Sequence, residues 1–377
     1  MSDGVVAAKL RLALADQVGS PGWRQALKTV PRELFLGEGV YRYEFGPGWV
    51  PVHRSEMSAE DWLVLAYTDE TWVTQINGVL AEDATEPVLI TRPTSSSTFP
   101  GLVVLMLEAA GIGEGDRILE VGTGTGYSTA LMCHRLGDEA VTSIEYDPVI
   151  AARAETAITR AGYAPHLAVG DGLEGYDANA PYDRLIATCA VRTIPLMWLW
   201  QVRAGGTITA PMRGWTDGVA FAHLQVAEDG SASGRFLEDD VYFMTARPHL
   251  PPPQSCLVMG RGAVSEGRVD PSILKDETAL WVAQLAVPQA QHGWAEDIFT
   301  LRDVSTGAQA DVRPDPDGGW TVYQHGPIKL WDEVEKVILT WQGAGSPHQS
   351  GFGLTVTRDR QYVWLGEPDG PSWDLPA

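Results

Sequence analysis

A glycine-rich turn carries the clearest chemical signal in the sequence. Residues 118–127, ILEVGTGTGY, have the pattern of a strand that runs into a turn and then a helix. Glycine at the alternate positions Gly122, Gly124 and Gly126 lets a ligand approach the backbone with no Cβ in the way. Tyr127 stands where the dinucleotide fingerprint has its third glycine, so a pyrophosphate ligand is disfavoured. A tight turn with a purely structural role is the alternative interpretation.

Three acidic residues follow successive predicted strands. Glu120 and Glu145 end the first two strands, and Asp171 lies in a Gly-Asp-Gly turn after the third. Each alone has an ordinary explanation, as a solvated strand end or a turn residue. Together they indicate a site for a ligand with ribose hydroxyls, an amine-bearing base and a cationic centre, because carboxylates accept hydrogen bonds from such groups. S-adenosylmethionine fits this description, since it has no phosphates and carries sulfonium and ammonium charges.

We therefore predict S-adenosylmethionine as the cofactor. No metal is expected beside it, because the 8 histidines are scattered without ligand spacing. The residues expected to bind the cofactor belong to the turn and to the three acidic strand ends: Glu120, Gly122, Thr123, Gly124, Gly126, Tyr127, Glu145, Asp171 and Gly172.

The elements that position these residues alternate regularly between residues 96 and 211. Short apolar runs at 117–121, 141–145, 166–169, 184–187 and 207–210 are separated by helical segments at 127–136, 148–161 and 194–202. This alternation is typical of a mostly parallel sheet with crossover helices. We predict an α/β, Rossmann-like fold of the class I S-adenosylmethionine-dependent methyltransferases, with an N-terminal cap and a C-terminal accessory domain.

The predicted organisation has three parts. Residues 1–90 form a helical cap with helices at 5–18 and 23–29, and residues 91–250 form the methyltransferase domain, which ends in a hairpin of 221–226 and 235–237. A proline cluster at 251–253 marks the boundary of the accessory domain, 251–377. This last part holds half of the 14 tryptophans, which indicates an aromatic core or, alternatively, a binding face for an extended peptide.

Composition excludes several other classes of protein. The chain has 27 Lys and Arg against 49 Asp and Glu, so its net charge of −22 repels nucleic acid. No run reaches about 18 apolar residues, so no membrane segment is predicted. The 3 cysteines are too few for a disulfide framework, and we expect a cytoplasmic location.

Residues 20–215 resemble the protein-L-isoaspartate O-methyltransferase family. The resemblance rests on an ordered set of short motifs: VPRELF at 30–35, EVGTGTGY at 120–127, VGDG at 169–172, APYD at 180–183, IP at 194–195 and GG at 205–206. It implies methyl transfer from S-adenosylmethionine to a carboxylate.

The resemblance also suggests where the substrate binds. Counted back without a gap from Glu120, the family's phrase of Ser-Ala-Pro-His type falls on Ser96-Ser97-Thr98-Phe99. Ser96 keeps the hydroxyl, whereas the Pro and His are replaced, which points away from an isoaspartyl substrate. Ser96 and the adjacent Ser95 are the predicted catalytic residues. The hydroxyl run at 94–98 also predicts an N-cap cluster for a helix from residue 100, whose free N–H groups suit a carboxylate, with capping alone as the alternative.

Further stretches are similar to a subgroup that accompanies ATP-grasp peptide maturases. These are PTSSSTFP at 93–100, YTDETWVTQ at 67–75 and the extension beyond residue 250. The similarity implies methylation of an Asp in a crosslinked ribosomal peptide of graspetide type, then closure to an aspartimide. A modified precursor peptide and an ATP-grasp ligase are the implied partners, with lanthipeptides and lasso peptides as other substrate classes. The alternatives are a general isoaspartyl repair methyltransferase and a peptide-binding scaffold with an inert core.

Overall fold

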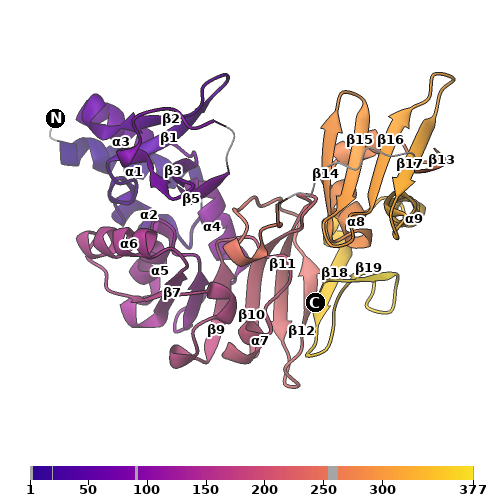
Figure 1. Cartoon of the computed structure of the whole chain (residues 1–377). Coiled ribbons are helices and arrows are strands. Elements are labelled where there is room, and N and C mark those ends of the chain that lie inside the picture. The colour runs from indigo at the N-terminus through magenta and orange to yellow at the C-terminus, as the bar shows by residue number, and fades with distance from the viewer. Residues whose placement is uncertain (1–2, 19, 90–91, 254–261, 377) are drawn as a thin grey trace. The chain divides into compact units, whose positions relative to one another are not determined.

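The computed structural model describes residues 3–18, 20–89, 92–253 and 262–376 (Figure 1). The chain divides into two compact units: unit 1 is Met1–Thr188 with Met197–Thr209, and unit 2 is Cys189–Leu196 with Ala210–Ala377. Compactness does not establish independent folding, so the division into 1–90, 91–250 and 251–377 stays a prediction. Its boundary between residues 90 and 91 lies outside the described residues.

Unit 1 contains the predicted parallel sheet. Its strand order is β10-β9-β6-β7-β8, and neighbouring strands in this order pair in parallel. The chain moves from β6 outward to β8 and then returns to the other side of β6, so a ligand crevice is expected at the carboxyl ends of the central strands. The strands are β6 (Ile118–Val121), β7 (Val141–Glu145), β8 (His166–Val169), β9 (Tyr182–Ala187) and β10 (Val202–Arg213), whose last residues belong to unit 2.

Helices connect these strands, as parallel pairing requires. The predicted helix 127–136 and the predicted strands 141–145 and 166–169 are confirmed with the same bounds. The helices are α5 (Tyr127–Leu136), α6 (Pro148–Arg160) and α7 (Leu196–Gln201). Asp147 caps α6 by accepting hydrogen bonds from the N–H groups of Val149 and Ile150.

The N-terminal part of unit 1 holds a second, antiparallel sheet that the sequence analysis did not predict. Its order is β2-β1-β3-β4, and β5 also pairs with β3. Helices α1 (Asp3–Val18) and α2 (Arg24–Thr29) confirm the two predicted helices, and α3 (Ala59–Ala66) and α4 (Pro100–Ala109) follow. The strands are β1 (Gly39–Glu44), β2 (Gly48–His53), β3 (Trp72–Ile76), β4 (Val79–Leu80) and β5 (Pro93–Ser97).

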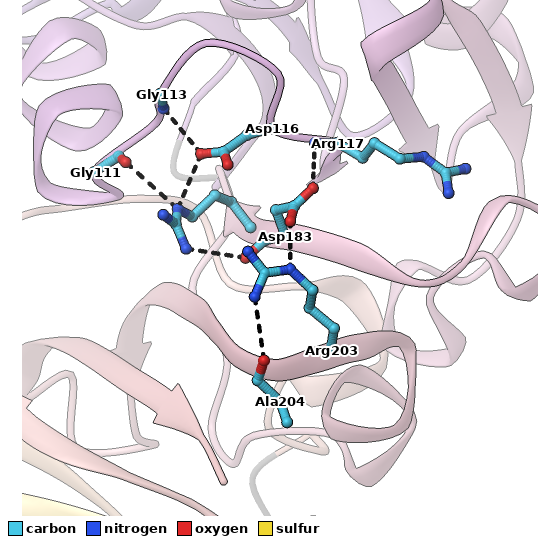
Figure 2. A network of polar contacts seen from close by, with 8 residues as sticks. Gly111, Gly113, Asp116, Arg117, Asp183, Arg203 and Ala204 are labelled. Carbon is cyan, nitrogen blue, oxygen red and sulfur yellow. Dashed lines mark hydrogen bonds and ion pairs between the residues drawn. The ribbon is translucent and has the colours of Figure 1, made fainter. Parts of the chain in front are cut away.

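Polar contacts fasten the amino ends of the central strands, at the sheet edge opposite the expected crevice. Figure 2 shows Asp183 accepting a hydrogen bond from the backbone N–H of Arg117 at 2.7 Å and pairing with Arg203. Arg184 pairs with Asp116 at 3.2 Å and donates a hydrogen bond to the carbonyl of Asp183 at 3.2 Å. Burial opposes ionisation of Asp183, but the Arg117 N–H and the Arg203 guanidinium outweigh it and lower the pKa of the carboxyl.

In its described residues, unit 2 is built from antiparallel strands and two α-helices. One set follows the order β11-β12-β18-β19-β20 and the other the order β13-β17-β16-β15-β14. The predicted hairpin is confirmed by β11 (Val219–Val226) and β12 (Ala232–Phe236). The remaining elements are β13 (Ala263–Gly267), α8 (Glu277–Ala286), β14 (Ala290–Ala295), β15 (Ile298–Asp303), β16 (Gln309–Pro314), β17 (Trp320–His325), α9 (Leu330–Gly343), β18 (Phe352–Val356), β19 (Gln361–Leu365) and β20 (Ser372–Asp374).

Aromatic side chains form much of the core of unit 2. The buried Trp281 packs edge-on against Phe236 and Phe352, with ring centroids 4.9 and 5.0 Å away. Trp331 is also buried and contacts Phe299 at 5.7 Å. Among the residues that the structure describes, every helix is too short or too polar to cross a lipid bilayer.

Candidate functional site

The glycine turn lies between β6 and α5 and needs glycine for two different reasons. Gly122, Gly124 and Gly126 have φ angles of 100°, 54° and 89°, in the left-handed region where side chains are strained. A Cβ on Gly126 would lie 2.9 Å from Ile158 of α6, so this glycine allows helix packing. Apart from the adjacent residues, the carbonyl oxygen of Ser96 is the only atom in the described part of the chain that would lie within 4 Å of a Cβ on Gly124, at 3.7 Å. Gly124 therefore presents bare backbone toward β5.

Glu145, at the end of β7, holds the turn in place. Its carboxylate accepts hydrogen bonds from the N–H groups of Gly124 at 2.8 Å and Asp147 at 3.0 Å. The side chain is half-buried. A carboxylate offers about four acceptor positions, so Glu145 has the capacity to accept from ribose hydroxyls as well as from the backbone.

Glu120 lies beneath the turn and is fully buried. Its carboxylate accepts hydrogen bonds from the hydroxyls of Thr129 at 2.5 Å and Ser143 at 2.7 Å, and also from Ser128. Burial raises the pKa of this carboxyl, and the three hydroxyl donors oppose that rise. The geometry supports a role in holding the turn from below, and a direct contact between Glu120 and a cofactor stays a prediction.

The other predicted cofactor residues fall into two groups. Thr123 and Tyr127 point into the core, where the Thr123 hydroxyl contacts Ser143 at 2.7 Å and the Tyr127 ring packs on Phe35. Asp171 is half-buried beside the neighbouring strand end, and its carboxylate accepts from the N–H of Leu173 at 2.9 Å. A Cβ on Gly172 would lie 2.4 Å from Val121 of β6. Glycine at position 172 thus allows this turn to approach β6 closely.

The hydroxyl run at 94–98 does not cap a helix, and that interpretation was wrong. Residues 93–97 form β5, and α4 begins at Pro100 with Phe99 as an N-cap that provides no side-chain acceptor. Two residues from a preceding loop accept hydrogen bonds from the backbone N–H groups at the start of α4 instead. Asp69 accepts from the N–H of Gly101 at 2.7 Å, and Thr71 accepts from the N–H of Phe99 at 3.0 Å.

The two predicted catalytic serines lie beside the glycine turn on β5. The Ser96 carbonyl faces Gly124. Ser95 is buried, and its hydroxyl accepts a hydrogen bond from Thr74 of β3 at 3.2 Å. Ser95 also lines a cavity of about 400 Å³ together with Gly124 and Thr125. The structure therefore brings Ser95 and Ser96 to the turn from a part of the chain about 30 residues upstream in the sequence.

Arg32, which the sequence analysis did not select, positions this segment. Its side chain is fully buried. The guanidinium donates to carbonyls of two segments, one that follows from the end of α3 and one at the end of β5: those of Ala66, Thr68 and Glu70 at 2.7 to 2.9 Å, and those of Ser97 and Thr98 at 3.4 and 3.3 Å. Burial lowers the pKa of Arg32 to about 10. Its place in the VPRELF motif was a usable signal, because a charged residue amid apolar ones needs buried partners.

Gln75 makes a second link that the sequence analysis missed. This buried side chain of β3 accepts from the hydroxyl of Thr94 at 2.7 Å and donates to Asp147 at 3.3 Å. It therefore connects β5 to the start of α6. The described part of the chain contains no cluster of His, Cys, Asp and Glu side chains that is arranged to hold a metal ion.

Comparisons with known proteins agree with this fold and turn. The sequence model of the family described as Protein-L-isoaspartate(D-aspartate) O-methyltransferase matches residues 50–247. A protein-L-isoaspartate O-methyltransferase of Ignicoccus hospitalis is 42% identical over 115 residues, which are 30% of this chain and 54% of that protein. One of Anaeromyxobacter dehalogenans (strain 2CP-C) is 38% identical over 157 residues, 41% of this chain and 72% of that protein.

A solved structure supports the same fold. It is titled protein-L-isoaspartate O-methyltransferase, and it is matched over 96% of this chain and 100% of its own with a TM-score of 0.55 and 19% identity. The predicted class I S-adenosylmethionine-dependent methyltransferase fold is thereby confirmed. The chain spans 52% to 58% of the first three curated relatives. From its turn, its sheet order and these matches, the chain belongs to the protein-L-isoaspartate O-methyltransferase family.

Proposed function

We propose that this chain transfers a methyl group from S-adenosylmethionine to a carboxylate of a peptide. The observation that carries the proposal is the left-handed glycine turn at the carboxyl end of β6, which Glu145 holds and which faces the Ser96 backbone. Bound S-adenosylmethionine supplies an electrophilic methyl group on a positively charged sulfur. Gly124 offers uncovered backbone to it, and Glu145 and Asp171 are the acceptors suited to its hydroxyl and amine groups.

The residues of this chain have to align the reactants, and they do not have to act as a general base. An Asp carboxyl has an ordinary pKa of about 3.9 and is ionised at neutral pH, so it attacks without losing a proton. Alignment and exclusion of water account for about 7 to 11 kcal/mol in well-oriented reactions. We assign the Ser96 hydroxyl to the substrate carboxylate, toward which it donates a hydrogen bond. Arg32 and Gln75 hold β5 and the turn that follows it in place for that contact.

For the substrate, we propose an Asp of a crosslinked ribosomal peptide. After methylation the next backbone nitrogen attacks the ester carbonyl and expels methanol, which gives a five-membered imide, the aspartimide. Replacement of the family's Pro-His pair by Thr98 and Phe99 supports this choice, as does the motif similarity to the ATP-grasp-associated subgroup. A modified precursor peptide would then be the substrate, and an ATP-grasp ligase would act before this enzyme.

Isoaspartyl repair is the second candidate. It is supported by the family to which the chain belongs and by the names of its relatives. The two functions share the donor site and differ in the acceptor. A repair enzyme accepts many flexible peptides, whereas a maturation enzyme acts on one preorganised ring, which loses less conformational freedom on binding.

Mass spectrometry with two substrates separates the candidates. The chain is incubated with S-adenosylmethionine and either a crosslinked precursor peptide or a linear isoaspartyl peptide, with Ser96→Ala as the matched control. We expect the crosslinked peptide to gain one methyl group and then lose methanol, with little turnover of the linear peptide. Efficient turnover of the linear peptide alone would favour repair, and no S-adenosylhomocysteine with either would favour an inert scaffold.

A further inference from the structure

Arg192 of unit 2 is a half-buried arginine with no carboxylate partner among the described residues. One of its terminal nitrogens donates to the carbonyl of Pro288 at 2.6 Å and to the side-chain oxygen of Gln289 at 3.0 Å. The guanidinium lies over the ring of Trp215, 3.6 Å from its centre. Its Nε is buried and has no hydrogen-bond partner in the described part of the chain.

This environment is unusual for a cation in such an acidic chain. Other arginines of unit 2 pair with carboxylates: Arg213 with Asp217 at 2.8 Å, and Arg268 with Glu335 at 3.0 Å. Burial lowers the pKa of Arg192 to about 10, and no acidic neighbour among the described residues offsets that effect. A desolvated charge is costly unless it is paired with an opposite charge, so an arginine that has only neutral partners among the described residues suggests that its counter-charge comes from a ligand.

The guanidinium also lines a pocket in unit 2. The pocket has a volume of about 370 Å³ including the solvent at its mouth, and the centre of a water-sized sphere can occupy about 20 Å³ of it. Its walls include Phe236 and Trp281, which are buried aromatic residues, and Met212. A space of this size suits one small polar group rather than a ring, and the walls suit an apolar neighbour of that group.

We propose that Arg192 binds an acidic side chain of the peptide substrate, flanked by an apolar residue, as an anchor. The Nη1 group of this guanidinium makes no hydrogen bond with the described residues, so its N–H groups can donate to a carboxylate. The guanidinium neutralises the charge of the carboxylate that it binds. A different carboxylate of the peptide therefore accepts the methyl group. The proposal rests on the proposed function only in taking a peptide as the substrate.

The test uses the full chain and two probes, acetyl-Leu-Glu-Leu-amide and acetyl-Leu-Gln-Leu-amide. Saturation-transfer NMR titrations give the dissociation constant of each. We expect the Glu peptide to bind about tenfold more tightly than the Gln peptide, which corresponds to about 1.4 kcal/mol. Arg192→Gln should abolish that preference. Arg313→Gln should keep it, since Arg313 is an exposed arginine of unit 2 that already pairs with Asp311.

Two further measurements keep the result interpretable. Ser96→Ala should keep the preference for the Glu peptide, because the anchor is not the methyl acceptor. In the unmodified chain, the NMR signal of the Arg192 Nε–H, assigned by its loss in Arg192→Lys, should shift with the Glu peptide and not with the Gln peptide. A preference that survives Arg192→Gln, or an unshifted Nε–H signal, would overturn the proposal. Calorimetry with S-adenosylhomocysteine tests the methyl-donor site separately.

Discussion

Alanine at Gly124 or at Gly126 should separate ligand binding from folding within one turn. Both glycines have left-handed φ angles, 54° and 89°, so an alanine at either position costs about 1 to 2 kcal/mol of folding free energy. Their surroundings differ. The two substitutions therefore control for each other, since the change in backbone preference is similar and only the space around the new methyl group differs.

The expected magnitudes follow from that space. At Gly126 the new Cβ would lie 2.9 Å from Ile158 in a packed core, which adds about 1 to 3 kcal/mol of overpacking and brings the loss of stability to about 2 to 5 kcal/mol. At Gly124 the nearest atom is the Ser96 oxygen at 3.7 Å, an ordinary contact. The alanine methyl group at position 124 would fill the gap in which we place the reactants. The affinity for the methyl donor should therefore fall at least about tenfold, which corresponds to about 1.4 kcal/mol of binding free energy.

Urea unfolding without ligand measures the stability change, and calorimetry with S-adenosylhomocysteine measures donor affinity. Gly126→Ala should unfold at clearly lower urea concentration than Gly124→Ala. Gly124→Ala should show the larger loss of affinity in protein that is still folded. If Gly124→Ala binds S-adenosylhomocysteine as tightly as the unmodified chain does, the turn is not the donor site, and equal stabilities would refute the packing argument.

Three other substitutions test individual side chains. Ser96→Ala should slow single-turnover methyl transfer by an amount equivalent to about 1.5 to 3 kcal/mol with little change in donor affinity, and a loss seen only in Ser95→Ala would move the role by one residue. Glu120→Gln should change donor affinity by less than about threefold, because its carboxylate contacts buried hydroxyls; a tenfold loss in calorimetry would show a direct cofactor contact. Asp183→Asn should lower the free energy of unfolding by about 1 to 2 kcal/mol at neutral pH without affecting donor affinity. The lowered pKa of Asp183 means that its stabilisation is present above the ordinary value of 3.8 and is lost as pH falls through the lowered value, so urea unfolding at about pH 3 and pH 7 should show a smaller difference in the variant.

The parallel half of unit 1 was predictable because its signals are local. Strand β7 and helix α5 follow from a short apolar run and from a glycine turn, and neither depends on a distant partner. The three glycines were singled out as positions where a ligand approaches bare backbone, and that role stays a prediction. Their positive φ angles are a second, conformational reason for glycine, and Gly126 serves helix packing as well.

The antiparallel sheet of the N-terminal part was not predictable in the same way. Strand β5 consists of proline, threonine and serines, which lack the alternation of a strand and favour caps and turns. It becomes a strand because β3 pairs with it and because the Arg32 guanidinium holds the carbonyls at its end. Both interactions join residues at least 17 positions apart in the sequence, so no local sequence pattern predicts them.

Strand register explains why Glu120 and Glu145, both predicted as ligand-facing strand ends, differ in the structure. In the pairing of β6 with β7, Glu120 lies opposite Ser143, and Val121 lies opposite Ile144. Glu145 therefore lies one residue beyond the last pair of β6 and β7, toward the carboxyl edge of the sheet. There its carboxylate accepts a hydrogen bond from the N–H of Gly124. Glu120 is one step further in, where burial demands hydroxyl donors. A shift of one residue in pairing would exchange these environments, and the sequence of a single strand does not specify its register with a neighbour.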